Sequence, residues 1–296
     1  MGSGIGGRQA RGGAHLSVEI HLVDGTYELF RCFHGAPRFA AEDGREVGAC
    51  RGLLETLAAL LRVDGAMHVA VAFDSVGLAR PEKGKDAVLA TQVPLAVDVC
   101  RALGFVVWPA ARWSADDVLA SAAATYAADD TVDRIVICSA DLDFLQCVRG
   151  ERVVAMNRSR RTVTDEAAVL ARFGVAPAAL PDLFALSGDR SDGVAGVPGW
   201  GRQTASALLA RWGSIEAIPG DHAGWDVGVR GAAARAVALR AHRDEALFAR
   251  DLLRLNTELP IRTPVADLRW RGPDAGRLAE VCRRLAVDRT PTVPVP

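Results

Sequence analysis

Residues 135–143 read IVICSADLD, which is a short apolar run of the kind that forms a buried strand, then Ser-Ala and two spaced aspartates. Two upstream stretches repeat this arrangement, HLVDG at residues 21–25 and VAFDS at residues 71–75. Short apolar runs rich in β-branched residues and bounded by polar residues are typical of strands inside a parallel sheet. These stretches predict an α/β protein with carboxylates at the ends of its strands.

Strand-like runs alternate with stretches of helical spacing through the first half of the chain. The predicted strands are Val18–Val23, Val69–Phe73, Val106–Trp108, Ile135–Cys138 and Val153–Met156. The predicted helices are Val47–Leu61, Val93–Leu103, Asp116–Ala128 and Asp165–Phe173. This alternation predicts a mostly parallel sheet with helices on both faces.

The strand signal disappears after about Pro177, and the remaining sequence has helical spacing. Helices are predicted at Leu183–Ser187, Gln203–Trp212, Ala232–Leu255 and Pro273–Leu285. We therefore expect an α/β domain over residues 17–176 and a helical region over residues 177–289, packed together without a flexible linker. Residues 1–16 and 290–296 have no periodicity and are expected to be disordered tails.

The composition is that of an ordinary globular protein. The chain has 296 residues, 50% of them hydrophobic, and 35 basic against 36 acidic residues give a net charge of -1. This balance argues neither for nor against nucleic acid as a partner. No uncharged apolar run approaches the roughly 18 residues of a membrane span, and the six cysteines never form a C-x-x-C pair. We expect a cytoplasmic protein with reduced cysteines and no membrane contact.

Aspartates occur at matching places along the chain, at a strand end or at the helix start that follows it. They are Asp24, Asp74, Asp116, Asp117, Asp141 and Asp143, and the helical half adds Asp189 and Asp192 in the stretch SGDRSDG. In open parallel sheets, ligands bind outside the carboxyl ends of the strands, so these side chains are expected to converge on one edge. A single such aspartate is more often a helix cap or a turn residue, but that explanation does not cover eight at matching positions.

Clustered carboxylates repel one another, at a cost of about 4 kcal/mol for two charges 4 Å apart at an effective dielectric constant near 20. Bound divalent cations remove this repulsion, and an all-oxygen ligand set favours Mg²⁺ or Mn²⁺ over zinc. Two such ions roughly 3.5–4 Å apart are a common device for hydrolysing phosphodiester bonds. The aspartates therefore predict a two-metal nuclease, in which Asp116 is expected to be the member that lies behind the direct metal ligands.

A glycine-rich turn follows the last aspartate pair. Residues 196–209 read GVPGWGRQTASALL, and Gly199 and Gly201 permit a tight turn with exposed backbone N–H groups before a helix begins. Such N–H groups at a helix N-terminus bind phosphate through hydrogen bonds and the helix dipole. An ordinary connection between helices is the alternative, but the place of the turn beside Asp189 and Asp192 favours contact with a nucleic acid backbone.

Together these motifs resemble the bacterial 5′-3′ exonuclease and flap endonuclease family, which includes the 5′ nuclease domain of DNA polymerase I. The similar segments are HLVDGTYELFRCFHG (21–35), AFDS (72–75), SADDVLASAA (114–123), ICSADLDFLQCV (137–148) and LSGDRSDGVAGVPGWGRQTASALLARWGSIEAI (186–218). The last segment is the most specific, because it resembles the final aspartate pair of the family and its helix–three-turn–helix DNA-binding motif.

The resemblance implies a PIN-like α/β nuclease domain with a helical DNA-binding region. It implies structure-selective cleavage of 5′ DNA ends and flaps, in replication or repair, with two Mg²⁺ or Mn²⁺ ions. Because the sequence has no polymerase portion, we expect a free-standing enzyme, and a monomer is the default for a protein that surrounds a DNA end. The implied metal ligands are Asp24, Asp74, Asp116 and Asp117 for one ion, and Asp141, Asp143, Asp189 and Asp192 for the other. The implied catalytic residues are Asp24, Asp74, Asp117, Asp141 and Asp143. The implied DNA contacts are Gly199, Gly201, Arg202, Arg31, Arg80, Lys83 and Lys85, with a K⁺ ion at the helix–three-turn–helix motif.

Two segments depart from the family pattern. The family usually has Glu-Ala-Asp-Asp where this chain has Ser114-Ala-Asp-Asp117, so one carboxylate is missing, although serine there caps a helix as well. After Asp74 the family has a longer basic stretch with a Tyr-Lys pair, the helical arch that gathers the 5′ strand, whereas Ser75–Val93 is shorter and lacks the aromatic residue. A reduced basic gateway and an exposed charged loop are equal interpretations of this segment.

Two other functions stay open at this stage. A non-catalytic DNA-junction binding protein would explain Ser114 and the short arch as signs of lost activity, although the presence of all eight aspartates argues against it. An RNA-cleaving PIN-type nuclease would explain the α/β half but not the glycine-rich turn. Serine and zinc hydrolases are excluded because the sequence has no G-x-S-x-G and no H-E-x-x-H motif.

Overall fold

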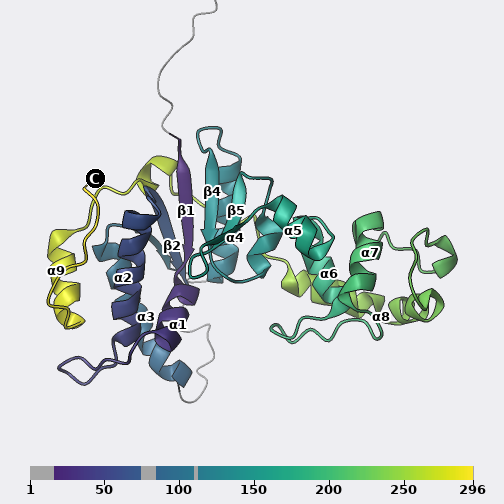
Figure 1. Ribbon diagram of the computed structural model, residues 1–296, viewed down its shortest axis with the longest axis horizontal. Helices are drawn as coiled ribbons and strands as arrows, with labels where there is room; N and C mark the ends of the chain where they lie inside the picture. Colours follow the sequence, from purple (N-terminus) through teal and green to yellow (C-terminus); the bar gives the residue numbers. More distant parts are fainter. Residues whose placement is uncertain (1–16, 75–84, 110–112, 296) are drawn as a thin grey trace, which may run out of the picture.

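The computed structural model describes residues 17–74, 85–109 and 113–295 (Figure 1). The strands are β1 (Glu19–Asp24), β2 (His68–Phe73), β3 (Val106–Pro109), β4 (Arg134–Cys138), β5 (Val153–Asn157) and β6 (Thr162–Thr164). The α-helices are α1 (Gly25–Gly35), α2 (Gly48–Val63), α3 (Lys85–Ala102), α4 (Ala115–Ala127), α5 (Glu166–Phe173), α6 (Leu180–Ser187), α7 (Arg202–Trp212), α8 (Ala232–Leu253) and α9 (Ala275–Arg284). The 3-10 helices are η1 (Asp143–Cys147), η2 (Pro177–Ala179), η3 (His222–Gly224) and η4 (Val265–Leu268). Residues 1–16, expected to be a tail, lie outside the described residues.

The strands form one sheet in the order β3-β2-β1-β4-β5-β6. Neighbouring strands are parallel except β5 and β6, which pair antiparallel. The chain builds the sheet outward from β1 to β3 and then, on the other side, from β4 to β6, so the order reverses between β1 and β4. Such a reversal leaves a crevice at the carboxyl ends of the two central strands, where ligands bind. The predicted mostly parallel α/β fold is confirmed.

Helices cover both faces of the sheet. Helices α2 and α3 contribute Leu57 and Val99 to the core on one face, and α4 contributes Leu119 to the core on the other. Strand β1 supplies both cores, because Leu22 packs with α4 whereas Val23 packs with α2 and α3. Successive side chains of a strand point to opposite faces, so an apolar strand such as β1 is buried on both sides. Functional side chains are therefore left to the ends of the strands.

The helical region forms a third core beyond the β5 side of the sheet (Figure 1). Leu183 of α6, Leu208 of α7 and Leu239 of α8 are all buried in it. Trp200, from the glycine-rich turn, packs edge-on against Trp225 with ring centroids 6.1 Å apart. This core fixes the glycine-rich turn to the helices around it.

The C-terminal segment leaves the helical region, which corrects the predicted extent of that region, residues 177–289. Trp270 donates its backbone N–H to the carbonyl of Met67 and its Nε1–H to the carbonyl of Leu103, each at 2.7 Å. Helix α9 then packs against α3, at the far side of the α/β part in Figure 1. Helical periodicity identified α9 but carries no information about the surface on which a helix packs.

Residues 290–295, expected to belong to a disordered tail, contain no helix or strand but do contact the protein. The carbonyl of Thr292 accepts a hydrogen bond from Arg62 at 2.8 Å, and Val293 packs against the core of α2 and α3. The Pro-rich composition excluded regular structure correctly, but it did not exclude docking of the segment.

Apart from the short 3-10 helices, one α-helix and one strand were not predicted from the sequence. Helix α1 follows β1 directly, and it begins where the side chain of Asp24 accepts the N–H of Tyr27 at 2.8 Å. Strand β6 is largely exposed, so it shows no hydrophobic pattern. Both elements depend on a cap or on pairing with a neighbour rather than on periodicity, which is why pattern reasoning missed them.

Among the described residues, no single helix has the length and hydropathy that crossing a membrane requires. Helix α5 and the segment Pro177–Ser187 pass that test only when they are taken as a pair, and they are bent by 45°.

Candidate active site

Asp24 and Asp141 lie at the reversal point of the sheet, at the end of β1 and just beyond the end of β4. Asp24 is only 4% exposed. Its Oδ1 accepts the N–H of Tyr27 at 2.8 Å, and its Oδ2 accepts the hydroxyl of Ser139, just beyond β4, at 2.9 Å. The same hydroxyl oxygen accepts the N–H of Asp141 at 3.2 Å. One serine therefore ties the two central strand ends together and holds Asp24 in place.

Asp74 is held against the N-terminus of α4. Its Oδ1 accepts the N–H of Ala115 at 2.8 Å, and its own N–H donates to Oγ1 of Thr26 at 2.9 Å. The positive end of the helix dipole favours a negative charge at this place. Burial raises the pKa of Asp24 to about 7, against the lowering effect of its hydrogen bonds, and the charge of Asp74 adds to the increase.

Asp116 lies close enough to this group for its charges to act on Asp116, and the expectation that Asp116 lies behind the direct metal ligands stays a prediction. Burial raises the pKa of Asp116 to about 8, and the charges of Asp24, Asp74, Asp141 and Asp143 raise it further. No described residue donates a hydrogen bond to its carboxylate. Burial and the neighbouring carboxylates therefore disfavour the negative charge of Asp116, and no described residue compensates that charge.

Asp117, expected to be catalytic and a metal ligand, also contacts a segment outside the cluster. Its Oδ1 accepts the N–H of Asn256 at 2.9 Å, on the segment that returns from α8 to the α/β part. Neighbouring positions of a helix point roughly 100° apart, so Asp116 and Asp117 do not face the same way. The hydrogen bond to Asn256 makes Asp117 an anchor for the returning segment, and its catalytic role stays a prediction.

The second part of the cluster combines η1 with a loop of the helical region. Asp143 donates its N–H to Oδ1 of Asp141 at 2.9 Å. Burial raises the pKa of Asp143 to about 7, and the charges of Asp141, Asp192 and Asp189 raise it further. Burial, then Asp189 and Asp141, also raises the pKa of Asp192. Aspartates from the two halves of the chain therefore act on one another electrostatically.

The donor chemistry of the cluster fits hard divalent cations. The mutually repelling aspartates offer only carboxylate oxygens, which Mg²⁺ and Mn²⁺ prefer. Among the described residues, no three His, Cys, Asp or Glu side chains are already close enough to hold an ion. Repelling carboxylates do not converge without a counter-charge, and a cation among them would also lower the raised pKa values. The residues present therefore suit the cations that the sequence predicted.

Ser114 caps α4, because its Oγ accepts the N–H of Asp117 at 3.0 Å. We expect Ser114→Glu to lower the Mg²⁺ concentration needed for half-maximal DNA cleavage by roughly tenfold, because it adds a carboxylate beside Asp74 and Asp116. We also expect a lower melting temperature, because a lost serine cap costs about 0.5–2 kcal/mol. Ser114→Ala is the control, since it removes the cap without adding a charge. Equal Mg²⁺ requirements for the two variants would contradict the expectation.

The glycine-rich turn, residues 196–201, is held by backbone hydrogen bonds on one side and is exposed on the other. Val197 donates its N–H to the carbonyl of Leu186 at 2.9 Å, and Trp200 donates to the carbonyl of Val197 at 3.0 Å. Gly199 is exposed at φ +76, and Gly201 precedes α7 without a side-chain cap. The N–H groups of the first turn of α7 therefore have no capping side chain, as a phosphate-binding helix N-terminus requires.

Basic residues near these features differ in how they are held. Arg202 is exposed, with its guanidinium carbon 5.3 Å from the centroid of the Phe173 ring. Arg31 forms an ion pair with Glu28 at 2.5 Å. Arg80 and Lys83 lie outside the described residues, and the side chain of Lys85 is not described either.

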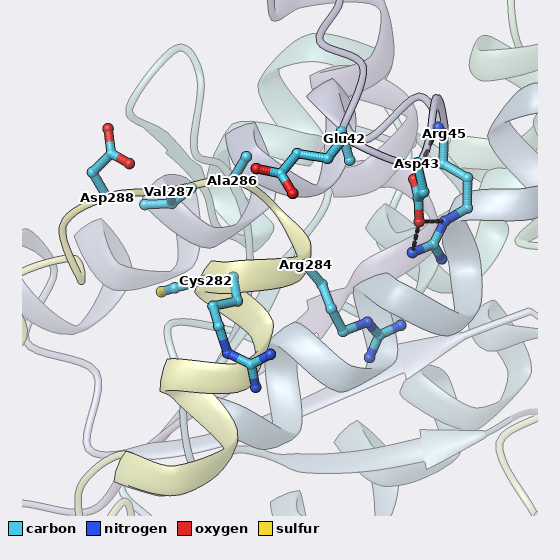
Figure 2. A pocket seen from close by; sticks show the side chains of 10 residues that line it. Glu42, Asp43, Arg45, Cys282, Arg284, Ala286, Val287 and Asp288 are labelled. Carbon is cyan, nitrogen blue, oxygen red and sulfur yellow. Dashed lines mark hydrogen bonds and ion pairs between the residues drawn. The ribbon is translucent and has the colours of Figure 1, made fainter.

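A separate pocket of about 620 Å³ lies between residues 41–45 and the end of α9 (Figure 2). Its arginines each have an acidic partner, namely Arg45 with Asp43, Arg283 with Glu280 and Arg284 with Asp98. Its charges are therefore balanced locally, and none of the aspartates of the cluster lines it. It is not part of the candidate active site.

Ser139 holds the carboxylate of Asp24 and Thr26 holds the backbone of Asp74, and sequence reasoning did not single them out. Each lies within two residues of a predicted aspartate, which is the signal that was available. The contact between Ser139 and Asp24 spans 115 residues of sequence. It exists because β1 and β4 pair in parallel with Val23 beside Cys138, and no local pattern reveals that register.

Comparison with protein families matches two consecutive parts of the chain. Residues 19–174 match the 5′-3′ exonuclease N-terminal resolvase-like domain, and residues 175–276 match the 5′-3′ exonuclease C-terminal SAM fold. The first match alone covers more than half of the chain.

Relatives of known name agree with these matches. The chain is 33% identical over 231 residues to a 5′-3′ exonuclease of Mycobacterium tuberculosis, covering 67% of this chain and 71% of that protein. It is 27% identical over 276 residues to a 5′-3′ exonuclease of Aquifex aeolicus, covering 90% and 91%. It is 30% identical over 279 residues to DNA polymerase I of Mycobacterium leprae, covering 89% of this chain but only 30% of the polymerase.

Solved structures share the fold. The 5′-exonuclease of bacteriophage T5, solved with divalent metal ions, aligns with a TM-score of 0.63 at 18% identity over 81% of this chain and 90% of that chain. The catalytic core of Rad2 in complex with DNA substrate aligns with a TM-score of 0.60 at 15% identity over 92% and 88%. The family matches and the named relatives confirm the resemblance found in the motifs, and this chain belongs to the 5′-3′ exonuclease family.

Proposed function

We propose that this protein is a metal-dependent 5′-3′ exonuclease and flap endonuclease that hydrolyses DNA phosphodiester bonds. The observation that carries the proposal is the group of mutually repelling aspartates at the reversal point of the sheet. Its members are Asp24, Asp74, Asp116, Asp141, Asp143, Asp189 and Asp192. Membership in a nuclease family supports the same reaction class.

Two divalent cations, Mg²⁺ or Mn²⁺, suit the two parts of this cluster. Asp24, Asp74 and Asp116 would hold one ion. The other would be held by Asp141, Asp143, Asp189 and Asp192. When bound, such a pair lowers the pKa of an attacking water and stabilises negative charge on the phosphate.

The protein itself orients the carboxylates and stores protons on them. Ser139 holds Asp24, and Thr26 holds the backbone of Asp74. Asp24, Asp116 and Asp143, with pKa values raised by burial to about 7, 8 and 7, retain protons near neutral pH. Cations must displace those protons, so cation affinity is expected to increase from about pH 6 to about pH 8.

DNA is the proposed partner, and the glycine-rich turn is its proposed point of attachment. Backbone N–H groups bind phosphate without reading bases, so selectivity would depend on the shape of a flap or a nicked end. A K⁺ ion at this turn would add positive charge where the phosphate approaches. The protein is proposed to act as a monomer in replication or repair.

The test is cleavage of a duplex that carries a labelled 5′ flap. We expect Mg²⁺ or Mn²⁺ to support release of short labelled products, EDTA to stop it, and excess Mg²⁺ to restore it. Single-stranded, nicked and flapped substrates, compared at equal concentration, measure the structural preference. Flap binding without cleavage at any Mg²⁺ or Mn²⁺ concentration would instead identify a junction-binding protein. Preferential cleavage of RNA strands would identify an RNA nuclease.

A further inference from the structure

A buried carboxylate lies one helical turn beyond Asp24. Glu28, in the first turn of α1, is 1% exposed and accepts hydrogen bonds from two arginines. Burying a carboxylate costs several kcal/mol, so it occurs only where charged partners compensate it. The arrangement therefore depends on both arginines.

The first partner, Arg158, comes from the turn between β5 and β6. Its side chain is 7% exposed, and its Nη1 donates to Oε1 of Glu28 at 3.2 Å. Its Nη2 donates to the carbonyl of Thr56 in α2 at 2.8 Å and lies 3.7 Å from Oδ2 of Asp64. The Glu28–Arg158 pair therefore joins α1, α2 and the end of β5 into one rigid unit.

The second partner, Arg31, reaches the surface. Its Nε and Nη2 both donate to Oε2 of Glu28, at 3.2 Å and 2.5 Å, and Nη2 is also 3.3 Å from Oγ1 of Thr56. Its side chain is 30% exposed, and Nη1 has no hydrogen-bond partner among the described residues. One edge of the guanidinium is fixed by the protein, and the other edge is free for an acceptor from outside.

Arg31 lies on the part of α1 that begins at the aspartate cluster. Tyr27, one turn before it, is close enough to feel the charges of Glu28, Arg31, Asp24 and Arg160. An arginine has about 2 kcal/mol of side-chain rotamer entropy to lose when it binds a phosphate. An arginine that is already held in one orientation loses less, and it directs the phosphate to one place.

We propose that Glu28, supported by Arg158, is a positioning residue that holds Arg31 for a DNA phosphate beside the aspartate cluster. The inference rests on the proposed function, because it takes DNA as the ligand. Glu28 contacts no substrate and acts only through Arg31. Replacing buried ion pairs by hydrophobic residues is often neutral or stabilising, so stability alone does not account for the trio, whereas orientation of Arg31 does.

The experiment measures affinity for a 5′-flap duplex by fluorescence anisotropy in EDTA, where no strand is cut, over a range of salt concentrations. Arg31→Ala is expected to weaken binding about tenfold and to reduce the slope of log Kd against log salt by about 0.9, the value for one lost phosphate contact on duplex DNA. Glu28→Gln is expected to weaken binding as well in the wild-type background, with a smaller change in slope because Arg31 keeps its charge. In the Arg31→Ala background, Glu28→Gln is expected to change neither affinity nor slope, although it lowers the melting temperature in both.

A second variant, Arg31→Lys, leaves the buried Glu28–Arg158 pair in place. It keeps the test decisive if Glu28→Gln unfolds the protein. Arg31→Lys keeps the charge but cannot form the two-point contact with Glu28, so its affinity is expected to fall toward that of Arg31→Ala, while its slope stays closer to that of wild type because the charge remains. Arg283→Ala, on the remote helix α9, is the control and is expected to bind like wild type. Wild-type behaviour of Arg31→Lys, or equal effects of Glu28→Gln in both backgrounds, would overturn the inference. Flap binding without metal-dependent cleavage would defeat the proposed function alone.

Discussion

Replacing Asp141 with alanine is expected to reduce the rate of metal-dependent flap cleavage by roughly 100-fold or more at saturating Mg²⁺, since metal stabilisation of the reacting phosphate is worth several kcal/mol. Asp141 is the member with the widest reach, because its charge raises the pKa values of Asp24, Asp116, Asp143 and Asp192. Its loss therefore removes a carboxylate whose charge acts on both parts of the cluster. Single-turnover rates measure the effect on chemistry separately from product release.

Asp141→Ala is expected to lose cleavage while it keeps DNA binding. The glycine-rich turn is unchanged in Asp141→Ala, so affinity for the flap duplex is expected to stay within about threefold of wild type. The matched control is Asp130→Ala, which removes an exposed aspartate before β4, at the opposite end of that strand. Cleavage by Asp141→Ala at a rate close to wild type would show that the cluster does not hold the catalytic cations.

Replacing Asp116 with asparagine is expected to stabilise the metal-free protein while abolishing cleavage. The pKa of Asp116 is raised by burial and by neighbouring carboxylates to about 8, from 3.8. The native protein therefore holds a proton that the unfolded chain has released, so the free energy of unfolding decreases as pH increases from about 4 to about 8. Asparagine has the same shape without the charge. The variant is expected to melt a few degrees above wild type at pH 8 in EDTA, with the difference vanishing toward pH 4.

Mg²⁺ is expected to make wild type more stable than Asp116→Asn. A ligand at about 100 times its Kd stabilises the native state by about 2.7 kcal/mol, and wild type has the complete carboxylate set to bind it. At pH 8, Asp116→Asn should therefore melt above wild type without Mg²⁺ and below wild type with Mg²⁺. A variant that is less stable than wild type in EDTA, or that gains as much from Mg²⁺, would show that Asp116 does not face the cations.

Local sequence patterns predicted the strands and the strand-end aspartates well. Strand β4 is observed at Arg134–Cys138 and was predicted at Ile135–Cys138, because apolar runs between polar residues depend on burial alone. The groups that each aspartate contacts could not be predicted from such patterns. Asp116 and Asp117 are neighbours of the same type, and only the returning segment at Asn256 distinguishes their roles.

Residue type and spacing alone established a parallel α/β core, a helical second half, a row of carboxylates at the strand ends and an open glycine-rich turn. The three-dimensional arrangement established which of those groups touch. Ser139 reaches Asp24, Glu28 joins Arg31 to Arg158, and α9 docks on α3. The division has a physical cause, because periodicity reflects burial of each segment, whereas these contacts depend on strand register and on long-range docking, which neighbouring residues in the sequence do not encode.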